Sequence, residues 1–120
     1  MSIRVAPHQV IDHAGHRPFA YVVSTRDDES QQSRAHVIAV VVDIKGGDVD
    51  CSRVGSSTRR NVSTNSNVTL IWPPIPRGNE QAPSNEYDSY TLIADGQATV
   101  RDETVVVTVS SAILHRPASD

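Results

Sequence analysis

The residues best suited to bind an anion lie in one segment, 52–61, which reads Ser-Arg-Val-Gly-Ser-Ser-Thr-Arg-Arg-Asn. A glycine and several hydroxyl groups let donors approach an anion closely, and two adjacent arginines supply planar forks for phosphate or carboxylate oxygens. If Ser57 or Thr58 caps a short helix, the free N–H groups of that helix point toward the same anion. The segment predicts a phosphate site, and an ordinary solvated connection is the alternative. The candidate binding residues within it are Ser52, Ser56, Ser57, Thr58, Arg59 and Arg60.

Apolar residues at a spacing of two predict the β-strands that must position this segment. Residues 36–44 are apolar on both faces, which predicts a central strand covered on both sides, and residues 46–48 then predict a hairpin turn. Residues 90–100 alternate cleanly, so we expect a half-buried strand with a bulge at Gly96. The valine-rich residues 104–109 predict a last, edge strand that needs a partner strand or a partner subunit.

Two polar stretches and the N-terminus complete the predicted organisation. Residues 73–84 are rich in proline and cannot continue a sheet, so we expect a long exposed loop. That loop is either a flexible connection, a lid over a cofactor, or an arm that reaches another protomer. Residues 26–34 are polar enough to form a hairpin tip, and the N-terminal residues predict a short helix.

In order and spacing, these segments resemble the pyridoxamine 5′-phosphate oxidase-like split-barrel family, whose members are small flavin- and deazaflavin-binding β-barrels. The resemblance spans roughly residues 5–117 and implies a mainly β fold: a six-stranded antiparallel split β-barrel of Greek-key type with short helices, forming one domain over residues 1–120. The segments that carry it are the N-terminal helix and residues 19–25, 35–40, 56–62, 67–72 and 90–100.

The resemblance also implies a ligand and its contacts. The cofactor is FMN or the deazaflavin coenzyme F-420, with its phosphate on residues 56–60 and its ring beside the strand backbone near His36 and Ile38. A buried, hydrogen-bonded histidine is the alternative for His36. Many members carry a lysine where this chain has Thr58, so we expect weaker phosphate binding than is usual in the family.

Composition restricts the class of protein. A chain of 120 residues with a formal net charge of −3 and no basic face predicts a single domain that does not bind nucleic acid. The lack of a leader-like N-terminus and of a long apolar run predicts a cytoplasmic protein without a membrane span. One phenylalanine, one tryptophan and three tyrosines leave an aliphatic core, and together with the resemblance this favours a homodimer. Cys51 cannot form an internal disulfide and is expected to be buried.

No set of protein groups in the sequence predicts catalysis by the chain alone. We find no nucleophile with a matched base and no paired carboxylates. His13 and His16 share a helical spacing but lack further ligands, so no metal site is predicted, and Trp72 is expected in the core or an interface. Three functions remain open: a flavin- or deazaflavin-dependent oxidoreductase acting on a small organic substrate, a non-catalytic carrier of a cofactor or ligand, and a structural dimer with an empty cleft.

Overall fold

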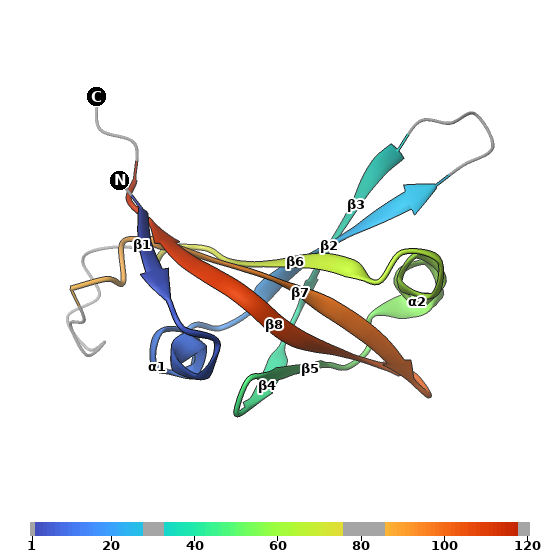
Figure 1. Cartoon of the computed structure of the whole chain (residues 1–120), viewed down its shortest axis with the longest axis horizontal. Helices are drawn as coiled ribbons and strands as arrows, with labels where there is room; N and C mark the ends of the chain where they lie inside the picture. Colours follow the sequence, from blue (N-terminus) through green and yellow to red (C-terminus); the bar gives the residue numbers. More distant parts are fainter. Residues whose placement is uncertain (1, 28–32, 76–85, 118–120) are drawn as a thin grey trace.

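The computed structural model describes residues 2–27, 33–75 and 86–117, which form one strongly curled antiparallel sheet with a short helix near each of two opposite ends (Figure 1). The strands are β1 (Ser2–Val5), β2 (Ala20–Asp27), β3 (Ser33–Val40), β4 (Val42–Lys45), β5 (Asp48–Cys51), β6 (Asn67–Trp72), β7 (Thr91–Arg101) and β8 (Thr104–His115). The helices are η1 (Pro7–Gln9), a single 3-10 turn, α1 (Val10–Ala14) and α2 (Gly55–Thr64).

The strand order is β3-β2-β6-β7-β8-β5-β4, and β1 pairs with the C-terminal part of β8. This topology confirms the predicted split-barrel class, although the sheet has eight strands where six were predicted. The count differs because residues 2–5 add β1 and because the expected strand over 36–44 is divided into β3 and β4. The short helix considered to follow Ser57 or Thr58 is present as α2 and begins earlier, at Gly55.

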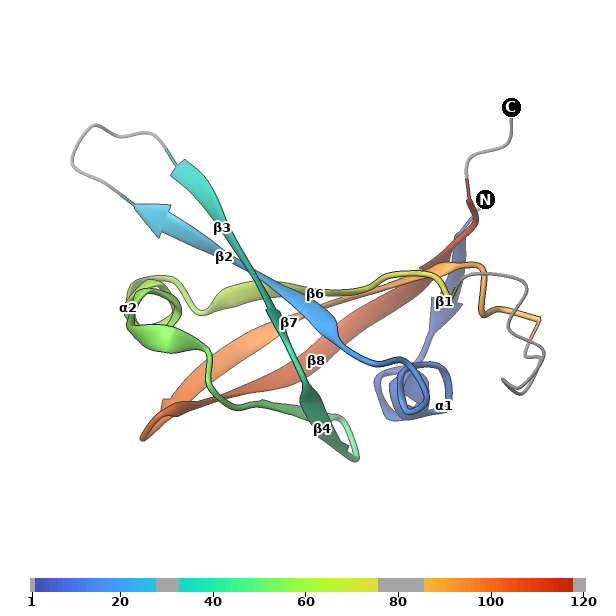
Figure 2. The ribbon, with the colours of Figure 1, turned by 180° about the vertical axis from the view of Figure 1, so that it is seen from behind.

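The prediction that residues 36–44 form a central strand covered on both sides is wrong. The strand is interrupted at Val41, so that β3 pairs with β2 at one end of the sheet order and β4 pairs with β5 at the other (Figure 2). Val37 is 54% exposed and Val41 is 73% exposed. Apolar residues on both faces indicate a strand, but they do not distinguish a buried central strand from an exposed apolar edge.

The strand β8 has the partner strands that its valine-rich sequence required, so it is not a sheet edge. Residues 105–108 pair with β5 and residues 112–115 pair with β1, while β7 runs along the other side, so its valines have partners within the chain. The predicted bulge is confirmed, because the β7–β8 register shifts between Asp95 and Gly96. The predicted hairpin turn at residues 46–48 is confirmed between β4 and β5, with Gly46 at a φ of 64°.

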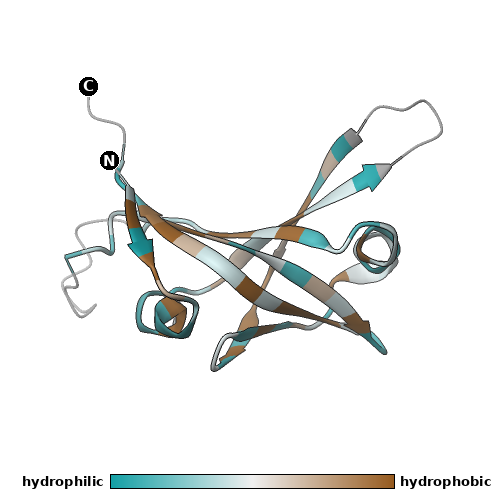
Figure 3. Ribbon diagram, viewed as in Figure 1, coloured by the Kyte–Doolittle hydropathy of each residue, from teal (hydrophilic) through white to brown (hydrophobic). Residues whose placement is uncertain are grey.

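The core lies on the inner face of the curled sheet, where apolar residues alternate with outward-facing polar ones along the strands (Figure 3). Leu70, Leu92 and Trp72 are fully buried, which confirms Trp72 as a core residue. The helix α2 packs against β2 and β7, and Asn61 Nδ2 donates a hydrogen bond of 3.1 Å to Ser24 Oγ. These contacts fix α2 beside the sheet.

Two sequence predictions fall partly outside the described residues. These are the proline-rich loop over 73–84 and the hairpin tip over 26–34, because the structure describes neither 76–85 nor 28–32. Within the described ranges, none of the helices has the length and apolar character needed to cross a membrane.

Candidate functional site

A cavity of about 640 Å³ lies where the chain passes from β3 to β4. Its volume is in the usual range for pockets that hold a small organic ligand. Because β3 and β4 belong to opposite ends of the sheet order, the cavity is placed at the seam that closes the curled sheet. Its walls are formed by Ala39, Val40, Val41, Val42, Asp43, Asp50, Ser52, Arg53 and Thr104.

The polar groups of this cavity come from three places, one of which is Thr104 at the start of β8. The connection between β5 and α2 supplies Ser52 and Arg53, and the β4–β5 hairpin supplies Asp43 and Asp50, which are cross-strand partners. Lys45 Nζ lies 3.7 Å from a carboxylate oxygen of each aspartate and offsets their mutual repulsion. The cavity therefore offers two hydroxyl groups, one guanidinium and two carboxylates to a ligand.

The candidate binding residues of segment 52–61 do not all lie at the cavity. Only Ser52 among them lines the cavity. The conditional prediction that Ser57 or Thr58 caps the helix is wrong, because α2 begins at Gly55 with Val54 in the cap position and no side-chain cap hydrogen bond. Ser56, Ser57 and Arg60 are exposed and Arg59 is half-buried.

The buried Thr58 side chain cannot present its hydroxyl at the surface. Its exposure is 0%, and its Oγ1 atom has no hydrogen-bond partner within the described residues. The spacing of residues 56–60 could not show which side chains of this helix face the core. Successive residues of a helix point to different faces, so Thr58 is buried although its neighbours Ser57 and Ser56 are exposed.

His36 and Ile38 lie on β3, next to the cavity but not in its wall. Ile38 packs against the core, and His36 is half-buried opposite Ser24 on β2. The wall begins one residue later, at Ala39. A contact of His36 and Ile38 with a cofactor ring stays a prediction.

The thiol of Cys51 lies at the end of β5 and is fully buried. Burial, followed by the charge of Asp50, raises the pKa of this thiol to about 12. The side chain is thus a small buried hydrophobe that stays protonated near neutral pH, as its prediction required.

A second groove, of about 330 Å³, lies on the outer face of the sheet and includes Thr69, Asp95 and Gln97. Its polar groups bind one another: Thr69 Oγ1 donates to Asp95 Oδ1 at 2.6 Å, and Gln97 Nε2 donates to Asn67. Because these donors and acceptors are already paired, the groove is a weaker candidate for a ligand than the seam cavity.

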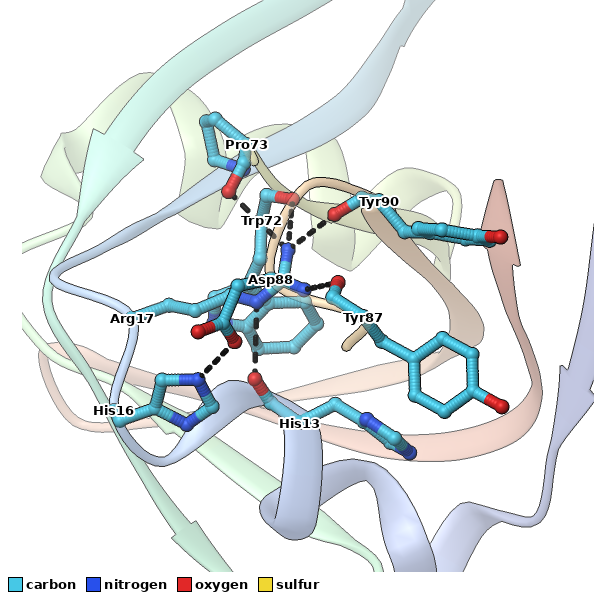
Figure 4. A network of polar contacts seen from close by, with 8 residues as sticks. All are labelled: His13, His16, Arg17, Trp72, Pro73, Tyr87, Asp88 and Tyr90. Carbon is cyan, nitrogen blue, oxygen red and sulfur yellow. Dashed lines mark hydrogen bonds and ion pairs between the residues drawn. The ribbon is translucent and has the colours of Figure 1, made fainter. Parts of the chain in front are cut away.

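Arg17 organises a polar cluster that is separate from the seam cavity (Figure 4). Its side chain is only 7% exposed, and its guanidinium donates hydrogen bonds of 2.7–3.2 Å to backbone carbonyl groups. The acceptors belong to His13, Trp72, Pro73, Tyr87 and Tyr90. Burial lowers the pKa of Arg17, and the carboxylate of Asp88 opposes that shift. Arg17 therefore joins α1, the end of β6 and residues 87–90.

Sequence reasoning missed Arg17 for a physical reason. All of its recorded acceptors are backbone carbonyl groups, which every residue carries, so no pattern of side-chain types marks them. The sequence also did not reveal the contact of His16, which lies beyond the end of α1. Its Nε2 atom is 2.6 Å from Asp88 Oδ1. Within the described ranges no group of three metal-ligating side chains occurs.

We expect Arg17→Lys to destabilise the protein by roughly 2–4 kcal/mol, because one ammonium cannot replace a planar fork that serves several buried carbonyl groups. The free energy of unfolding from urea denaturation measures this effect. Arg4→Lys, on the exposed face of β1, is the matched control and should change it by less than about 0.5 kcal/mol. Equal stabilities for the two variants would show that Arg17 does not hold this cluster together.

The pH dependence of stability should report His13. Partial burial, and then the nearby Arg17, lower the pKa of His13 below its ordinary value of 6.5. As the pH falls below 6.5 the unfolded chain takes up a proton that the folded chain resists, so the stability linked to His13 is present above 6.5 and lost below it. Unfolding midpoints of His13→Gln between pH 7.5 and 5 should fall less than those of the parent. His8→Gln should track the parent, and a His13→Gln slope equal to the parent's would contradict the assignment.

Comparisons with known sequences give a partial match. No family model matches the chain. The uncharacterized proteins Mb0449c of Mycobacterium bovis and MT0457 of Mycobacterium tuberculosis are each 33% identical to it over 94 residues, a match that covers 71% of this chain and 56% of the relative. The chain thus spans about half the length of the curated relatives it matches.

Comparisons of structure give several matches that cover nearly the whole chain. An FMN-binding domain of a flavin reductase-like enzyme from Shewanella baltica aligns with a TM-score of 0.64 at 8% identity, over 95% of this chain and 77% of that one. The FAD binding protein of Mycobacterium smegmatis gives 0.58 at 18% identity, over 97% and 100%. A protein assigned as a pyridoxamine 5′-phosphate oxidase from Listeria innocua gives 0.56 at 11% identity, over 88% and 92%. The chain has the split-barrel fold of these pyridoxamine 5′-phosphate oxidase-like proteins.

Proposed function

We propose that the cavity at the β3–β4 seam binds a flavin-type cofactor, FMN or the deazaflavin coenzyme, and that the loaded protein is an oxidoreductase acting on a small organic substrate. The observation that carries this proposal is the cavity itself, with about 640 Å³ between the strand residues 39–43 and the connection that leads into α2. The names of the structural neighbours, an FMN-binding domain and an FAD binding protein, support a ligand of this class.

The residues of the cavity fit such a ligand chemically. Val41 and Val42 give an apolar wall for a flat ring. The strands β3 and β4 end the strand order, so each has one edge without a partner strand among the described residues, where backbone groups can contact a ligand. Ser52 can donate to or accept from a polar chain. When bound, the flavin would supply reversible hydride transfer. The chain would orient the ring and exclude water from one face of it.

We place the phosphate end of the ligand at the start of α2, as the sequence predicted. Ser56 and Ser57 are exposed in the first helical turn, where backbone N–H groups have no acceptor within the helix. Arg59 and Arg60 follow in the next turn and bring positive charge. Thr58 is buried and is left out of this end of the site.

A titration of the apoprotein with FMN and with the deazaflavin coenzyme tests the proposal and chooses between the two cofactors. Binding of either one, followed by substrate-dependent loss of its oxidised absorbance, would support an oxidoreductase. Binding without turnover of any hydride donor or acceptor would favour a non-catalytic carrier. Absence of binding to both would contradict the proposal and favour a structural dimer with an empty cleft.

Replacing Arg59 or Arg60 by Ala should weaken cofactor binding by roughly ten- to a hundredfold, because each lost hydrogen bond to a charged acceptor contributes about 1.5–3 kcal/mol. We would measure affinities of both single variants and the pair at two salt concentrations. Arg101→Ala, on an exposed arginine before the β7–β8 turn, is the matched control and should bind like the parent. Parent-like affinity in all variants would show that these arginines point to solvent.

We also propose that two copies of the chain associate through the outer face of the sheet. Residues Ala39, Tyr21, Ile71, Ile93 and Ile113 are successive cross-strand partners, so they form one largely apolar row across five neighbouring strands on the side away from the core. Tyr21 is 37% exposed. Val37, two residues from Ala39 on the same face of the edge strand β3, is 54% exposed and extends the apolar surface beside the row. An exposed apolar surface of this kind needs a cover, and a second copy of the chain supplies it.

Light scattering at micromolar concentration should give twice the chain mass of 13.0 kDa. Val37→Asp should shift the population toward the monomer, because it buries a charge in the apolar contact. Thr99→Asp, at an exposed position outside the row, serves as the control and should leave the dimer intact. A parent that scatters as a 13.0 kDa species would refute the dimer.

A further inference from the structure

The helix α2 is built mostly from residues that form helices poorly. Residues 55–64 read Gly-Ser-Ser-Thr-Arg-Arg-Asn-Val-Ser-Thr, in which only the two arginines are strong helix formers. Serine, threonine and asparagine bond to nearby backbone groups outside a helix, and glycine and valine lose more freedom than alanine when a helix forms. A helix of 10 residues is also too short to be stable alone in water. Contacts with the rest of the molecule must therefore hold α2 in its helical form.

The two ends of α2 lack the groups that usually stabilise helix ends. Val54 occupies the N-cap position without a side-chain hydrogen bond, and the first turn contains no acidic residue. The last turn contains no basic residue, and Asn65 at the C-cap is extended rather than left-handed. The N–H groups of the first turn therefore have neither a capping side chain nor an opposite charge in the helix itself.

The face of α2 that packs against β2 and β7 is largely polar. Its buried residues are Thr58, Asn61 and Val62. Asn61 Nδ2 donates to Ser24 Oγ at 3.1 Å, but the Thr58 hydroxyl is fully buried and has no hydrogen-bond partner among the described residues. Such a hydroxyl destabilises the packed helix, because water can bond to it only when the helix opens. Val62 is the apolar residue of this buried set, so burial of apolar surface adds little to the stability of α2.

The sheet does not depend on α2 for its strand pairing. The helix joins β5 to β6 along the chain, and those strands pair elsewhere, β5 with β4 and β8 and β6 with β2 and β7. The helix can therefore open while every strand pair stays intact. Segments with few buried apolar contacts open at a lower free energy than the strands of a core.

We propose that α2 opens locally in the free protein and that an anion bound at its first turn closes it. The N–H groups of that turn converge on the anion only when the helix is formed, so binding stabilises the closed form. Thr58, Asn61 and Ser24 set the free energy of opening, because they form the polar contact that opening breaks. This inference rests on the proposed phosphate position at the start of α2, and it adds a conformational switch to that site.

Three variants of the full chain change the stability of α2 and leave the residues of the proposed phosphate site in place. Thr58→Val removes the unpartnered hydroxyl and keeps the shape of the side chain, so it should favour the closed helix. Ser63→Ala and Ser63→Gly both remove the hydrogen bond of the exposed Ser63 Oγ to the Arg59 carbonyl, so the difference between them reports helix propensity. Ser111→Ala, at an exposed position of β8, is the matched control.

Amide hydrogen exchange of residues 59–64, followed by NMR, measures the opening of α2. In the ligand-free parent these amides should exchange at least about tenfold faster than the paired amides of β6 and β7. Inorganic phosphate should slow them by one plus the ratio of its concentration to its dissociation constant, which is about tenfold at nine times that constant. The constant comes from the phosphate-induced shifts of residues 55–58. FMN should have the same effect, and sodium chloride at equal ionic strength should not.

We expect Thr58→Val to slow the ligand-free exchange of α2 by about fivefold, and Ser63→Ala to exchange about fivefold more slowly than Ser63→Gly. Exchange in β6 and β7 should be the same in all of these variants, which would confine the change to the helix. Ser111→Ala should match the parent.

Three results would overturn the inference. One is exchange in α2 that is as slow as exchange in β6 and β7 of the ligand-free parent. Another is faster exchange in Thr58→Val, because the hydroxyl would then stabilise the closed helix. The third is phosphate that shifts the resonances of residues 55–58 and leaves exchange in α2 unchanged.

The same measurements separate this inference from the proposed function. If phosphate closes α2 and FMN does not bind, the flavin proposal fails and the switch stands. If FMN binds at the seam cavity and exchange in α2 stays fast, the flavin proposal stands and the switch fails. If neither phosphate nor FMN binds, both fail.

Discussion

The structure depends on one extended run of chain, residues 33–45, that serves both ends of the same sheet. Its first part, β3, pairs with β2, and its second part, β4, pairs with β5 at the opposite end of the strand order. A single run can do this only if the sheet curls until its ends meet, and the interruption at Val41 is where it changes partner. The seam cavity is a consequence of that closure, because two unpaired edges and the connection into α2 meet there.

A second constraint holds the other end of the molecule. Arg17 places a permanent positive charge in a nearly buried position, where it is stabilised by backbone carbonyl groups from three separate segments. This arrangement ties α1 to the end of β6 and to the residues that precede β7. The donors of Arg17 are hydrogen-bonded to these carbonyl groups. By contrast, Arg53 in the seam cavity has no side-chain partner among the described residues. The Arg17 cluster is therefore structural, whereas the seam cavity is the proposed ligand site.

Much of the fold could be predicted because alternation is a local property. Residues 90–100 follow the predicted pattern, and Gly96 marks a real bulge, since both depend on neighbours along one strand. The prediction of a central strand over 36–44 was wrong because a strand buried on two faces and an exposed apolar edge strand have the same sequence pattern. In the site, Thr58 of the predicted segment 52–61 turns into the core. Arg53, which has a positive φ, lines the cavity, and the contacts of Arg59 and Arg60 with a ligand stay predictions. The φ of Arg53 and the carbonyl acceptors of Arg17 could not be predicted, because neither depends on a pattern of residue types.

We propose that the closure of the sheet at Val41 creates the ligand site. The most direct measurement is an amide NMR map of the parent protein titrated with FMN. We expect the largest shifts on residues 39–43 and 50–53, on both sides of the seam, and no change in the outer groove around Thr69 and Gln97. Saturable shifts centred on that outer groove, with the seam residues unaffected, would contradict it.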